Sequence, residues 1–502
     1  MTIPSSSSDA PSRQLTLRNI SITVAVAVGL HLPALVRKAA LNSDEATIAT
    51  VARMMRHGAG LYAGAVDRKP PGAFTLYRLI EPLFGDWSLT AGRWIALAAT
   101  IVAMWILGFE ARRRWPGVAP VAVAVLGIVA FSVLPAEDSR AVGFELLATL
   151  PAVAAFVLGA RRRYVLAGCM LGVAALFKQP MLLGALPLAV QCLLPVGGVS
   201  TRWPRRVLLL AGAGVVTAAT VLMGLAPFGL SNALSWYAGS GDKYLSGTRL
   251  TTVTIITLEQ IGSILGLTMG LLILATVIWG RRRIPLDLAV WIIASLIATA
   301  IGLRFILHYF NQLIPSLVLL AAPALTAATF ARGAALIPTR AKVARFGLVW
   351  MIGAALFSMA TLLLPTVFHD LPNVDRVVRA IDAHTSPGQK IFVWGQAPEI
   401  YWTSDRDPAT RYPHIGFITG VTPKRPGVPA YLLAQPGAAE KLLSDLEKAH
   451  PALIIDAAIA SVRGGDRYPL ATSPIAAYVA ANYCEIDVVD GIRLLSPCTP
   501  SP

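Results

Sequence analysis

The chain has 502 residues, of which 55% are hydrophobic and only 14% are charged, and its mean hydropathy is +0.63. An average soluble chain is about 25% charged. This composition excludes an intrinsically disordered chain, a fibrous repeat and a small disulfide scaffold. It predicts a polytopic α-helical membrane protein.

The net charge of +16 belongs to the hydrophobic part of the chain. Residues 1–368 contain 31 Lys and Arg against 13 Asp and Glu, whereas residues 369–502 contain 12 against 14. The excess forms short arginine clusters between apolar segments, which the positive-inside rule places on the cytoplasmic side of a membrane. Nucleic-acid binding is not expected, because no soluble part of the chain carries a basic face.

Apolar segments that can span a membrane follow a Ser-rich N-terminal segment. Residues 1–18 are predicted to form a cytoplasmic tail, and residues 19–368 a transmembrane domain. A helix needs about 20 apolar residues to cross a bilayer. About eleven spans are predicted, at residues 19–37, 88–109, 118–134, 142–160, 164–177, 181–197, 207–228, 258–279, 286–303, 306–330 and 346–367.

The apolar run 164–197 is interpreted as two short helices, because Phe177-Lys178-Gln179-Pro180 interrupts it. Proline stops a helix. Without this break, all later arginine clusters would face outward, against the positive-inside rule. The same topology places ten of the 13 acidic residues of the membrane part outside, which indicates a polar site at the outer face.

Residues 369–502 differ in character from the membrane part. Helix-like and strand-like stretches alternate there, which predicts a soluble α/β domain. An odd number of spans places this domain on the outer face of a bacterial cytoplasmic membrane. Cys484 and Cys498 can then form a disulfide in an oxidising compartment.

The first outer loop, residues 41–86, carries candidate catalytic side chains. Ser43 is predicted to cap a helix that lies along the membrane surface, with Asp44 and Glu45 in its first turn. Two adjacent carboxylates at this position can act as a general base or orient an acceptor. Lys69 precedes a double proline, and its ammonium can bind an anionic phosphate as a compact charge.

Short motifs spread over nearly the whole chain carry a resemblance to a known family. They are Ser43-Asp44-Glu45-Ala46, Tyr62 with Asp67-Arg68-Lys69-Pro70-Pro71-Gly72, Asp138 with Ala141-Val142-Gly143-Phe144-Glu145-Leu146, Phe177-Lys178-Gln179-Pro180, His308-Tyr309-Phe310-Asn311-Gln312-Leu313-Ile314-Pro315, and Trp394-Gly395 with Tyr401. In this order they resemble the GT-C glycosyltransferases. The most similar branch contains the protein O-mannosyltransferases and lipid A aminoarabinose transferases (glycosyltransferase family 39-like).

The resemblance implies an integral-membrane enzyme that moves a sugar from a polyprenyl phosphate to an acceptor at the outer face. The anomeric carbon would be inverted without a metal, and the acceptor would be an envelope glycan, a lipid or a protein. Asp44 would be the base that activates the acceptor, and Glu45 its neighbour in binding or orienting it. Which of the two acids acts is left open.

Fixed cations near the donor are expected, because a departing phosphate develops negative charge. Candidates on the predicted outer side are Lys69, Lys178, Lys243, Arg249, Arg304 and His308. Candidates for binding the sugar or acceptor are Tyr62, Asp67, Asp138, Glu145 and Tyr309. Asp138 and Glu145 are seven residues apart, so they can share a helix face and bind sugar hydroxyls or a divalent ion. No cofactor is expected, because no cluster with metal-ligand spacing accompanies them.

Two other functions are compatible with a membrane protein of this kind. A transporter or flippase of polyprenyl-linked glycans would have symmetric halves with paired broken helices, which the sequence lacks. A non-catalytic scaffold for envelope assembly would not need Asp44 and Glu45. An enzyme would transfer a sugar, and Asp44→Asn would abolish this transfer. Neither alternative predicts this result.

Overall fold

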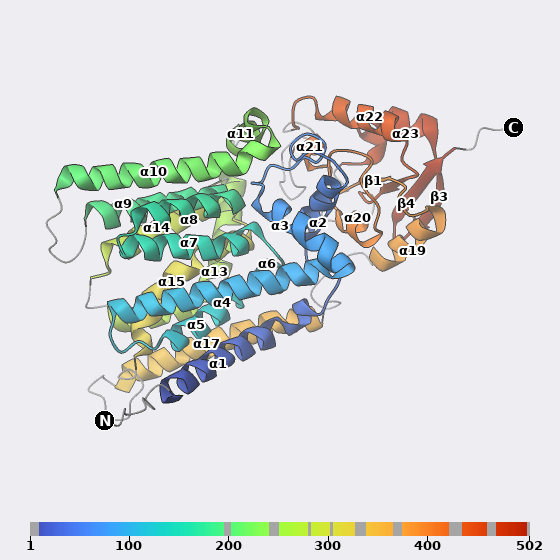
Figure 1. Cartoon of the computed structure of the whole chain (residues 1–502). Helices are drawn as coiled ribbons and strands as arrows, with labels where there is room; N and C mark the ends of the chain where they lie inside the picture. The colour runs from blue at the N-terminus through green and yellow to red at the C-terminus, as the bar shows by residue number, and fades with distance from the viewer. Residues whose placement is uncertain are drawn as a thin grey trace, which may run out of the picture.

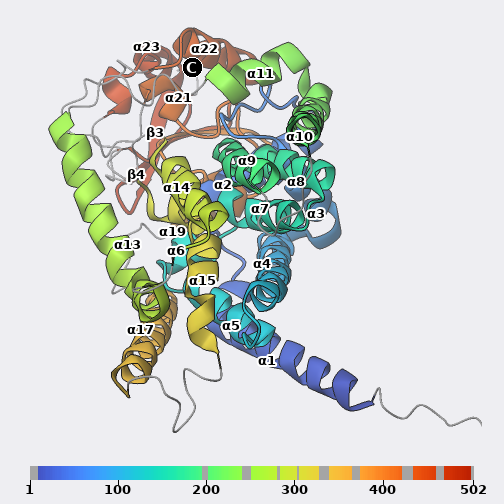
Figure 2. The ribbon, with the colours of Figure 1, turned by 90° about the vertical axis from the view of Figure 1, so that its left-hand side faces the viewer.

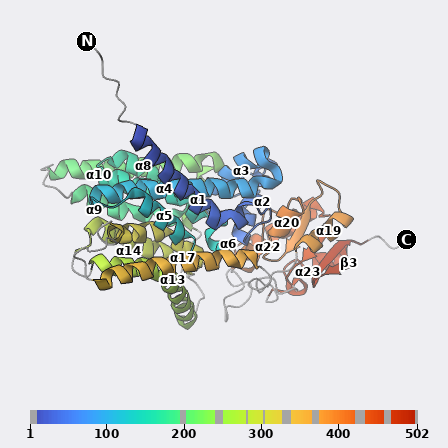
Figure 3. The ribbon, with the colours of Figure 1, turned by 90° about the horizontal axis from the view of Figure 1, so that it is seen from below.

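The computed structural model describes residues 10–194, 202–239, 250–279, 283–301, 305–326, 338–364, 374–420, 434–458 and 468–498. Long apolar helices run side by side through most of the molecule, and Figure 2 looks along them. A small sheet with its helices lies beyond one end of this bundle, whereas α1 begins near the other end (Figures 1 and 3).

A helix lies at each position where a membrane span is predicted. These helices are α1 (Ala10–Leu35), α4 (Ser88–Arg114), α5 (Pro120–Phe131), α7 (Phe144–Ala160), α8 (Tyr164–Phe177), α9 (Ala185–Leu193), α10 (Trp203–Leu225), α13 (Leu250–Trp279), α14 (Leu286–Ala300), α15 (Ile314–Ala321) and α17 (Pro338–Leu363). Within the described ranges, five segments are long and apolar enough to cross a membrane, and the others are shorter apolar helices. The count of eleven crossings therefore stays a prediction.

The apolar run 164–197 is interrupted at the lysine-proline motif. Helix α8 ends at Phe177, the backbone of Lys178 is extended, and a 3-10 turn, η2 (Gln179–Gly184), leads into α9. Proline at the second position of η2 lacks the N–H that would continue the α-helix. The break leaves the side chain of Lys178 at the end of the bundle that contains the candidate site.

Small residues allow the helices to pack closely. A Cβ on Gly168 of α8 would come within 2.3 Å of the Ala213 carbonyl oxygen on α10, and Thr217 donates a hydrogen bond to the Gly168 carbonyl at 2.9 Å. A Cβ on Gly270 of α13 would likewise lie 2.3 Å from the Gly347 carbonyl of α17. Such contacts are typical of helix pairs in membranes, where hydrophobic burial does not drive helices together.

Short helices gather at the end of the bundle next to the sheet (Figure 1). They are α2 (Ser43–Arg56), α3 (Gly72–Phe84), α6 (Ala136–Ser139), α11 (Leu230–Gly239) and η4 (Leu307–Gln312). One prediction about α2 is wrong. Its N-cap is Asn42, whose side chain accepts the Glu45 N–H at 2.8 Å, and not Ser43. Residues 45–55 are all buried, because α3 and the C-terminal region pack against α2, and its position along a membrane surface stays a prediction.

The C-terminal region contains a four-stranded sheet in the order β1-β2-β4-β3. Strands β1 (Ile391–Trp394) and β2 (Leu453–Asp456) are parallel, and β4 (Ile492–Pro497) pairs antiparallel with β2 and with β3 (Tyr483–Val489). Helices α19 (Val374–His384), α20 (Glu399–Thr403), α21 (Gly416–Thr419), α22 (Ala438–Ala449) and α23 (Ala476–Asn482) accompany the sheet. A disulfide joins Cys484 on β3 to Cys498 just after β4.

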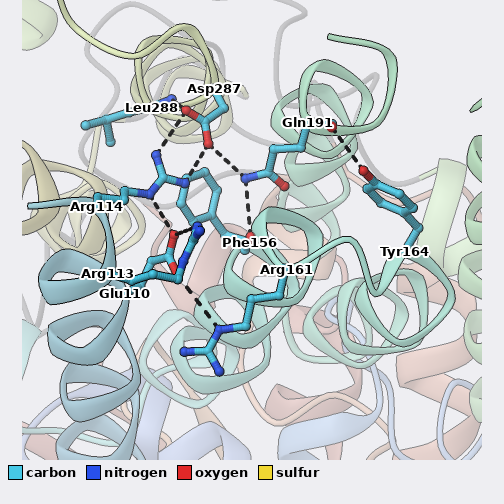
Figure 4. Close-up of polar contacts among 9 residues, drawn as sticks. All are labelled: Glu110, Arg113, Arg114, Phe156, Arg161, Tyr164, Gln191, Asp287 and Leu288. Carbon is cyan, nitrogen blue, oxygen red and sulfur yellow. Dashed lines mark hydrogen bonds and ion pairs between the residues drawn. The ribbon is translucent and has the colours of Figure 1, made fainter. Parts of the chain in front are cut away.

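A charged cluster joins several helices at the end of the bundle that lies away from the sheet (Figures 1 and 4). Glu110 at the end of α4 is fully buried and accepts hydrogen bonds from Arg113 and Arg114. Arg114 also donates to both oxygens of Asp287 on α14, at 3.1 and 2.7 Å, and Gln191 on α9 donates to Asp287 at 3.1 Å. Because every acid here is paired with protein groups, this cluster acts as a structural clamp between α4, α9 and α14.

Candidate active site

Asp44 lies at the centre of a group of charged side chains at the sheet end of the bundle. Its position in the first turn of α2 suits a carboxylate, because the helix dipole is positive there. Oδ1 lies 2.7 Å from Nζ of Lys69, and Oδ2 lies 3.4 Å from Nε2 of His308. The Asp44 side chain is 35% exposed, so part of it is accessible from outside while the rest is enclosed by the protein.

Lys69 is held in place by its own loop. The Asp67 carboxylate accepts the Lys69 backbone N–H at 2.9 Å, and the Tyr62 hydroxyl donates to the Lys69 carbonyl at 3.0 Å. The Lys69 ammonium lies 4.5 Å above the ring of Phe144, a cation–π distance. The double proline that follows starts α3 and fixes the end of this loop.

His308 links Asp44 to a second carboxylate. Its Nδ1 lies 2.9 Å from Oδ1 of Asp138 on α6, while Nε2 faces Asp44. Asn311, one turn further along η4, donates to the Asp138 backbone carbonyl at 3.0 Å. Asp138 therefore orients the imidazole, and the two contacts place His308 between two acids.

Lys178 and Glu145 form the adjacent ion pair. Nζ of Lys178 lies 2.5 Å from Oε1 of Glu145, at the start of α7, and 4.1 Å above the ring of Tyr309. Asp138 and Glu145 lie on separate helices, since α6 ends at Ser139 and α7 begins at Phe144. The expectation that they share one helix face is wrong, but His308 and Lys178 still bring both acids into the group around Asp44.

The neighbouring charges keep Asp44 and Lys69 ionised. Burial opposes the charge on Asp44, but the Lys69 ammonium and His308 outweigh it and hold the pKa of Asp44 well below its ordinary value. Burial also opposes the charge on Lys69, and Asp44 and Asp67 outweigh it and raise the pKa of Lys69. For Asp67 burial is the larger effect and raises its pKa. The site thus combines an accessible carboxylate with fixed cations.

Glu45 has a different environment from its neighbour Asp44. Its side chain is fully buried, and its two oxygens accept hydrogen bonds from the Arg93 guanidinium. The backbone N–H groups of Leu41 and Val142 also donate to it, at 2.9 and 3.0 Å. Glu45 therefore ties the start of α2 to α4 and to the segment before α7.

Comparisons with known proteins identify this architecture. The chain is similar to a crystal structure of ArnT from Cupriavidus metallidurans bound to undecaprenyl phosphate, with a TM-score of 0.62, 17% identity, and coverage of 96% of this chain and 98% of that one. The apo state of the same protein gives a TM-score of 0.57 at 16% identity, covering 97% and 98% of the two chains. The chain has a GT-C fold.

Two further comparisons agree with the GT-C fold. The archaeal oligosaccharyltransferase AglB from Archaeoglobus fulgidus, in complex with an inhibitory peptide and a dolichol-phosphate, matches with a TM-score of 0.52 and 15% identity, over 94% of this chain and 73% of that one. Residues 68–223 match the family model described as dolichyl-phosphate-mannose-protein mannosyltransferase. A comparison with curated proteins found no match. The resemblance to GT-C membrane glycosyltransferases that the sequence motifs predict is thereby confirmed.

Most of the residues predicted for the site meet in one place within this GT-C fold. A continuous set of contacts joins Asp44, Lys69, His308, Asp138, Lys178, Glu145 and Tyr309. Its two halves meet at the rings of His308 and Tyr309, whose centroids are 4.9 Å apart. Tyr62 and Asp67 support the Lys69 loop. Lys243, Arg249 and Arg304 lie outside the described residues.

Two residues that build the site, Arg93 and Asn42, are not among the site residues predicted from the sequence. Arg93 is buried on α4, and besides Glu45 it donates to the backbone carbonyls of Ala34, Arg37 and Ala39. Asn42 caps α2 and donates to the Glu137 carbonyl at 2.5 Å. The available signal for Arg93 was its position inside a predicted membrane span. A charged residue there costs free energy unless it is paired or functional. For Asn42 only the general preference for Asn at helix starts was available.

In the part of the chain that the structure describes, no group of three or more His, Cys, Asp and Glu side chains has an arrangement that could hold a metal ion. The acids around Asp44 are separated by cations instead, since Lys69, His308 and Lys178 each contact at least one carboxylate. The donor set therefore suits an anionic ligand better than a cation, because an anion can replace a carboxylate at each of these cations.

Proposed function

We propose that this protein is an integral-membrane glycosyltransferase that transfers a sugar from a polyprenyl phosphate to an acceptor at the outer face of the cytoplasmic membrane. The acceptor is a glycan, lipid or protein of the cell envelope. The observation that carries the proposal is the accessible Asp44 carboxylate, 2.7 Å from Lys69 and 3.4 Å from His308, in a GT-C fold. A base next to fixed cations is what removal of a proton and departure of a phosphate require.

The residues divide between the two halves of the reaction. Asp44 removes the proton from an acceptor hydroxyl or amine, whose oxygen or nitrogen then bonds to the anomeric carbon. The bond between that carbon and the phosphate oxygen breaks, and the electron pair leaves with the polyprenyl phosphate. Attack from the face opposite the leaving group inverts the anomeric carbon. Lys69, Lys178 and His308 stabilise the charge that develops on the phosphate.

The ion pair of Asp44 and Lys69 gives the donor a way to activate the base. With Lys69 in contact, the pKa of Asp44 lies well below its ordinary value, so Asp44 is a weak base. A phosphate that binds Lys69 competes with Asp44 for the ammonium and weakens its hold on the carboxylate. The pKa of Asp44 then rises because burial is no longer opposed as strongly. Proton removal is thus favoured only when the donor is in place.

The orientation of the site follows from the proposal. The disulfide between Cys484 and Cys498 fits an oxidising compartment outside the cytoplasm. The C-terminal sheet carries this disulfide and lies at the same end of the bundle as α2, whose first turn contains Asp44 (Figure 1). The arginine clusters at the other end, including Arg113, Arg114 and Arg161, suit the cytoplasmic side (Figure 4).

We assign Glu45 a positioning role and Asp44 the catalytic role. Glu45 is fully buried and its two oxygens are held by Arg93 and two backbone N–H groups, so an acceptor would have to displace these donors to reach it. Asp44 presents its oxygens to Lys69 and His308 and is partly exposed. This assignment selects one member of the acidic pair as the base.

A transfer assay with purified protein in nanodiscs tests the proposal. Native polyprenyl-phosphate sugars serve as donor and an envelope fraction as acceptor, and mass spectrometry detects the product. Asp44→Asn is expected to lower the turnover rate by about 10²–10⁴-fold, the usual contribution of a general base. Asp86→Asn is the matched control, because Asp86 is an exposed acid of the same predicted outer loop, and its turnover should equal that of the wild type.

The alternatives predict other results in the same assay. A transporter moves polyprenyl-linked glycan across sealed vesicles and forms no covalent product. A scaffold binds polyprenyl phosphate equally well in wild type and Asp44→Asn and has no turnover to lose. Product formation that is equal in both proteins would show that Asp44 is not the base.

A further inference from the structure

A polar pocket lies between the C-terminal end of α2 and the C-terminal sheet, whereas Asp44 is in the first turn of the same helix. Its volume is about 340 Å³, within the range of roughly 300–1,000 Å³ that is usual for ligand pockets. We name it the outer pocket. The charged residues that line it are His57, Lys390, Asp407, Arg411, Asp445 and Lys448.

Both acids of the outer pocket are already paired with protein groups. Asp445 accepts two hydrogen bonds from the Arg411 guanidinium, at 2.8 and 2.7 Å, and one from the Arg411 backbone N–H at 3.0 Å. Asp407 lies 2.5 Å from Nδ1 of His57 and 3.3 Å from Nε of Arg53. Neither carboxylate therefore needs a cation from a ligand.

Two lysines remain as the unpaired charges of the outer pocket. Lys390, just before β1, and Lys448, in the last turn of α22, are both exposed. Within the part of the chain that the structure describes, neither ammonium has a hydrogen bond or an ion pair. The pocket therefore presents positive charge at its rim and polar groups, among them Thr410, on its walls. Charge-assisted hydrogen bonds to carboxylate or phosphate oxygens would satisfy these lysines.

The outer pocket is connected to the candidate active site by the segment that carries Lys69. This segment leaves α2 at His57, lines the pocket with Ala59 and Gly64, and reaches Lys69 five residues later. The Val66 backbone N–H donates to the Arg411 carbonyl at 2.9 Å, which fixes the segment to the pocket wall. Met54 is ten residues after Asp44 on α2, so the pocket begins about 15 Å from the base along the helix axis. A ligand that reaches both must be longer than one monosaccharide.

We propose that the outer pocket is an acceptor subsite that binds the carboxylate or phosphate group of an anionic glycan. Lys390 and Lys448 bind the anionic group, and the rest of the glycan extends along the Lys69 segment toward Asp44. This inference deepens the proposed function and rests on it for the identity of the occupant as an acceptor. The pocket would give the enzyme a preference for acidic acceptors that the candidate active site alone does not provide.

Direct binding to the full-length protein tests the subsite without using turnover. Trigalacturonate is the anionic probe, maltotriose the neutral one, and isothermal titration in detergent measures their dissociation constants. Lys390→Ala/Lys448→Ala is expected to weaken trigalacturonate binding about tenfold or more, because two charge-assisted contacts are lost. Lys441→Ala is the matched control, since Lys441 is exposed on the same helix as Lys448 but does not line the pocket. Its binding should stay within about twofold of the wild type.

The outcomes separate this inference from the proposed function. Asp44→Asn should bind trigalacturonate as the wild type does while losing transfer. Displacement of trigalacturonate by inorganic phosphate would extend the subsite to phosphorylated glycans, and binding without such displacement would restrict it to carboxylated ones. The inference is overturned if maltotriose binds equally well, if the double variant binds trigalacturonate unchanged, or if transfer is active and the wild type does not bind trigalacturonate.

Discussion

The Glu45 carboxylate and the Arg93 guanidinium form a fully buried ion pair that joins α2 to α4. Arg93 Nε lies 2.8 Å from Oε1 of Glu45, and Nη2 contacts Oε2. The two side chains are 0% and 1% exposed, whereas the adjacent Asp44 is 35% exposed. One acid of the pair thus fixes the helix start, whereas the other contacts the cations Lys69 and His308 of the candidate site.

Removal of Arg93 is expected to destabilise the protein. Arg93→Met leaves Glu45 buried without its charge partner, which should lower the free energy of unfolding by about 3–5 kcal/mol. Thermal unfolding in detergent measures the effect. Arg78→Met serves as control because Arg78 is exposed on α3, and its unfolding should change by no more than about 0.5 kcal/mol. Equal stability of the two variants would show that the buried pair does not hold α2.

Removal of the Lys69 charge is expected to raise the pKa of Asp44. In the wild type, burial opposes ionisation, and Lys69 and His308 outweigh it, so the pKa is depressed. Lys69→Met removes the first of these cations and leaves the burial. The carboxyl absorption of Asp44, identified in the infrared spectrum by comparison with Asp44→Asn, should therefore appear at a higher pH than in the wild type.

The depressed pKa of Asp44 in the wild type also makes the stability of the fold depend on pH. A carboxylate with a depressed folded-state pKa stabilises the fold above its unfolded pKa of about 3.9, and this contribution is lost as the pH falls through the folded-state pKa. The wild type should therefore be more stable than Lys69→Met near neutral pH, and the difference should shrink below about pH 4. Lys38→Met is the control, since Lys38 pairs with the exposed Asp86 at 3.8 Å. If Lys38→Met shifted the pH at which the Asp44 absorption appears as far as Lys69→Met does, the shift would not come from the contact between Lys69 and Asp44.

Loss of the Asp138 carboxylate is expected to lower kcat/KM for the donor, because Asp138 positions His308. Asp138 holds Nδ1 of His308 at 2.9 Å, and removal of a hydrogen bond to a charged group costs about 1.5–3 kcal/mol. Asp138→Ala, which removes the acceptor as well as the charge, should therefore lower kcat/KM for the donor at least about tenfold. A structural role alone would lower the melting temperature and leave the kinetics per folded molecule unchanged. Steady-state kinetics together with a melting curve distinguishes the two.

The clamp at the opposite end of the bundle is expected to affect stability and not the reaction. Arg114 contacts Glu110 and both oxygens of Asp287 (Figure 4), so Arg114→Ala leaves two acids without their shared partner. The free energy of unfolding should fall by about 3–5 kcal/mol. Arg112→Ala, which removes an exposed neighbour, is the control. A similar loss of stability in both variants would mean that loss of any arginine charge in this region destabilises the protein, whether or not the arginine belongs to the clamp.

The sequence alone determined the class of the protein and the positions of its long helices. Apolar length and arginine clusters locate spans without knowledge of tertiary contacts, because a bilayer imposes both on each segment separately. The break at Lys178 could be read in the same way, since proline acts on its own backbone. The motif around Asp44, Lys69 and His308 indicated the fold family through its order along the chain.

Only the tertiary structure decided which acid is the candidate base and where the outer pocket lies. Asp44 and Glu45 are neighbours with the same chemistry, and the difference between them comes from Arg93, 48 residues away. The outer pocket needs α2 together with β1 and α22, which follow α2 by more than 300 residues in the sequence. Local sequence patterns do not predict such contacts between distant segments, because the exposure and the charge partners of a side chain depend on how these segments pack.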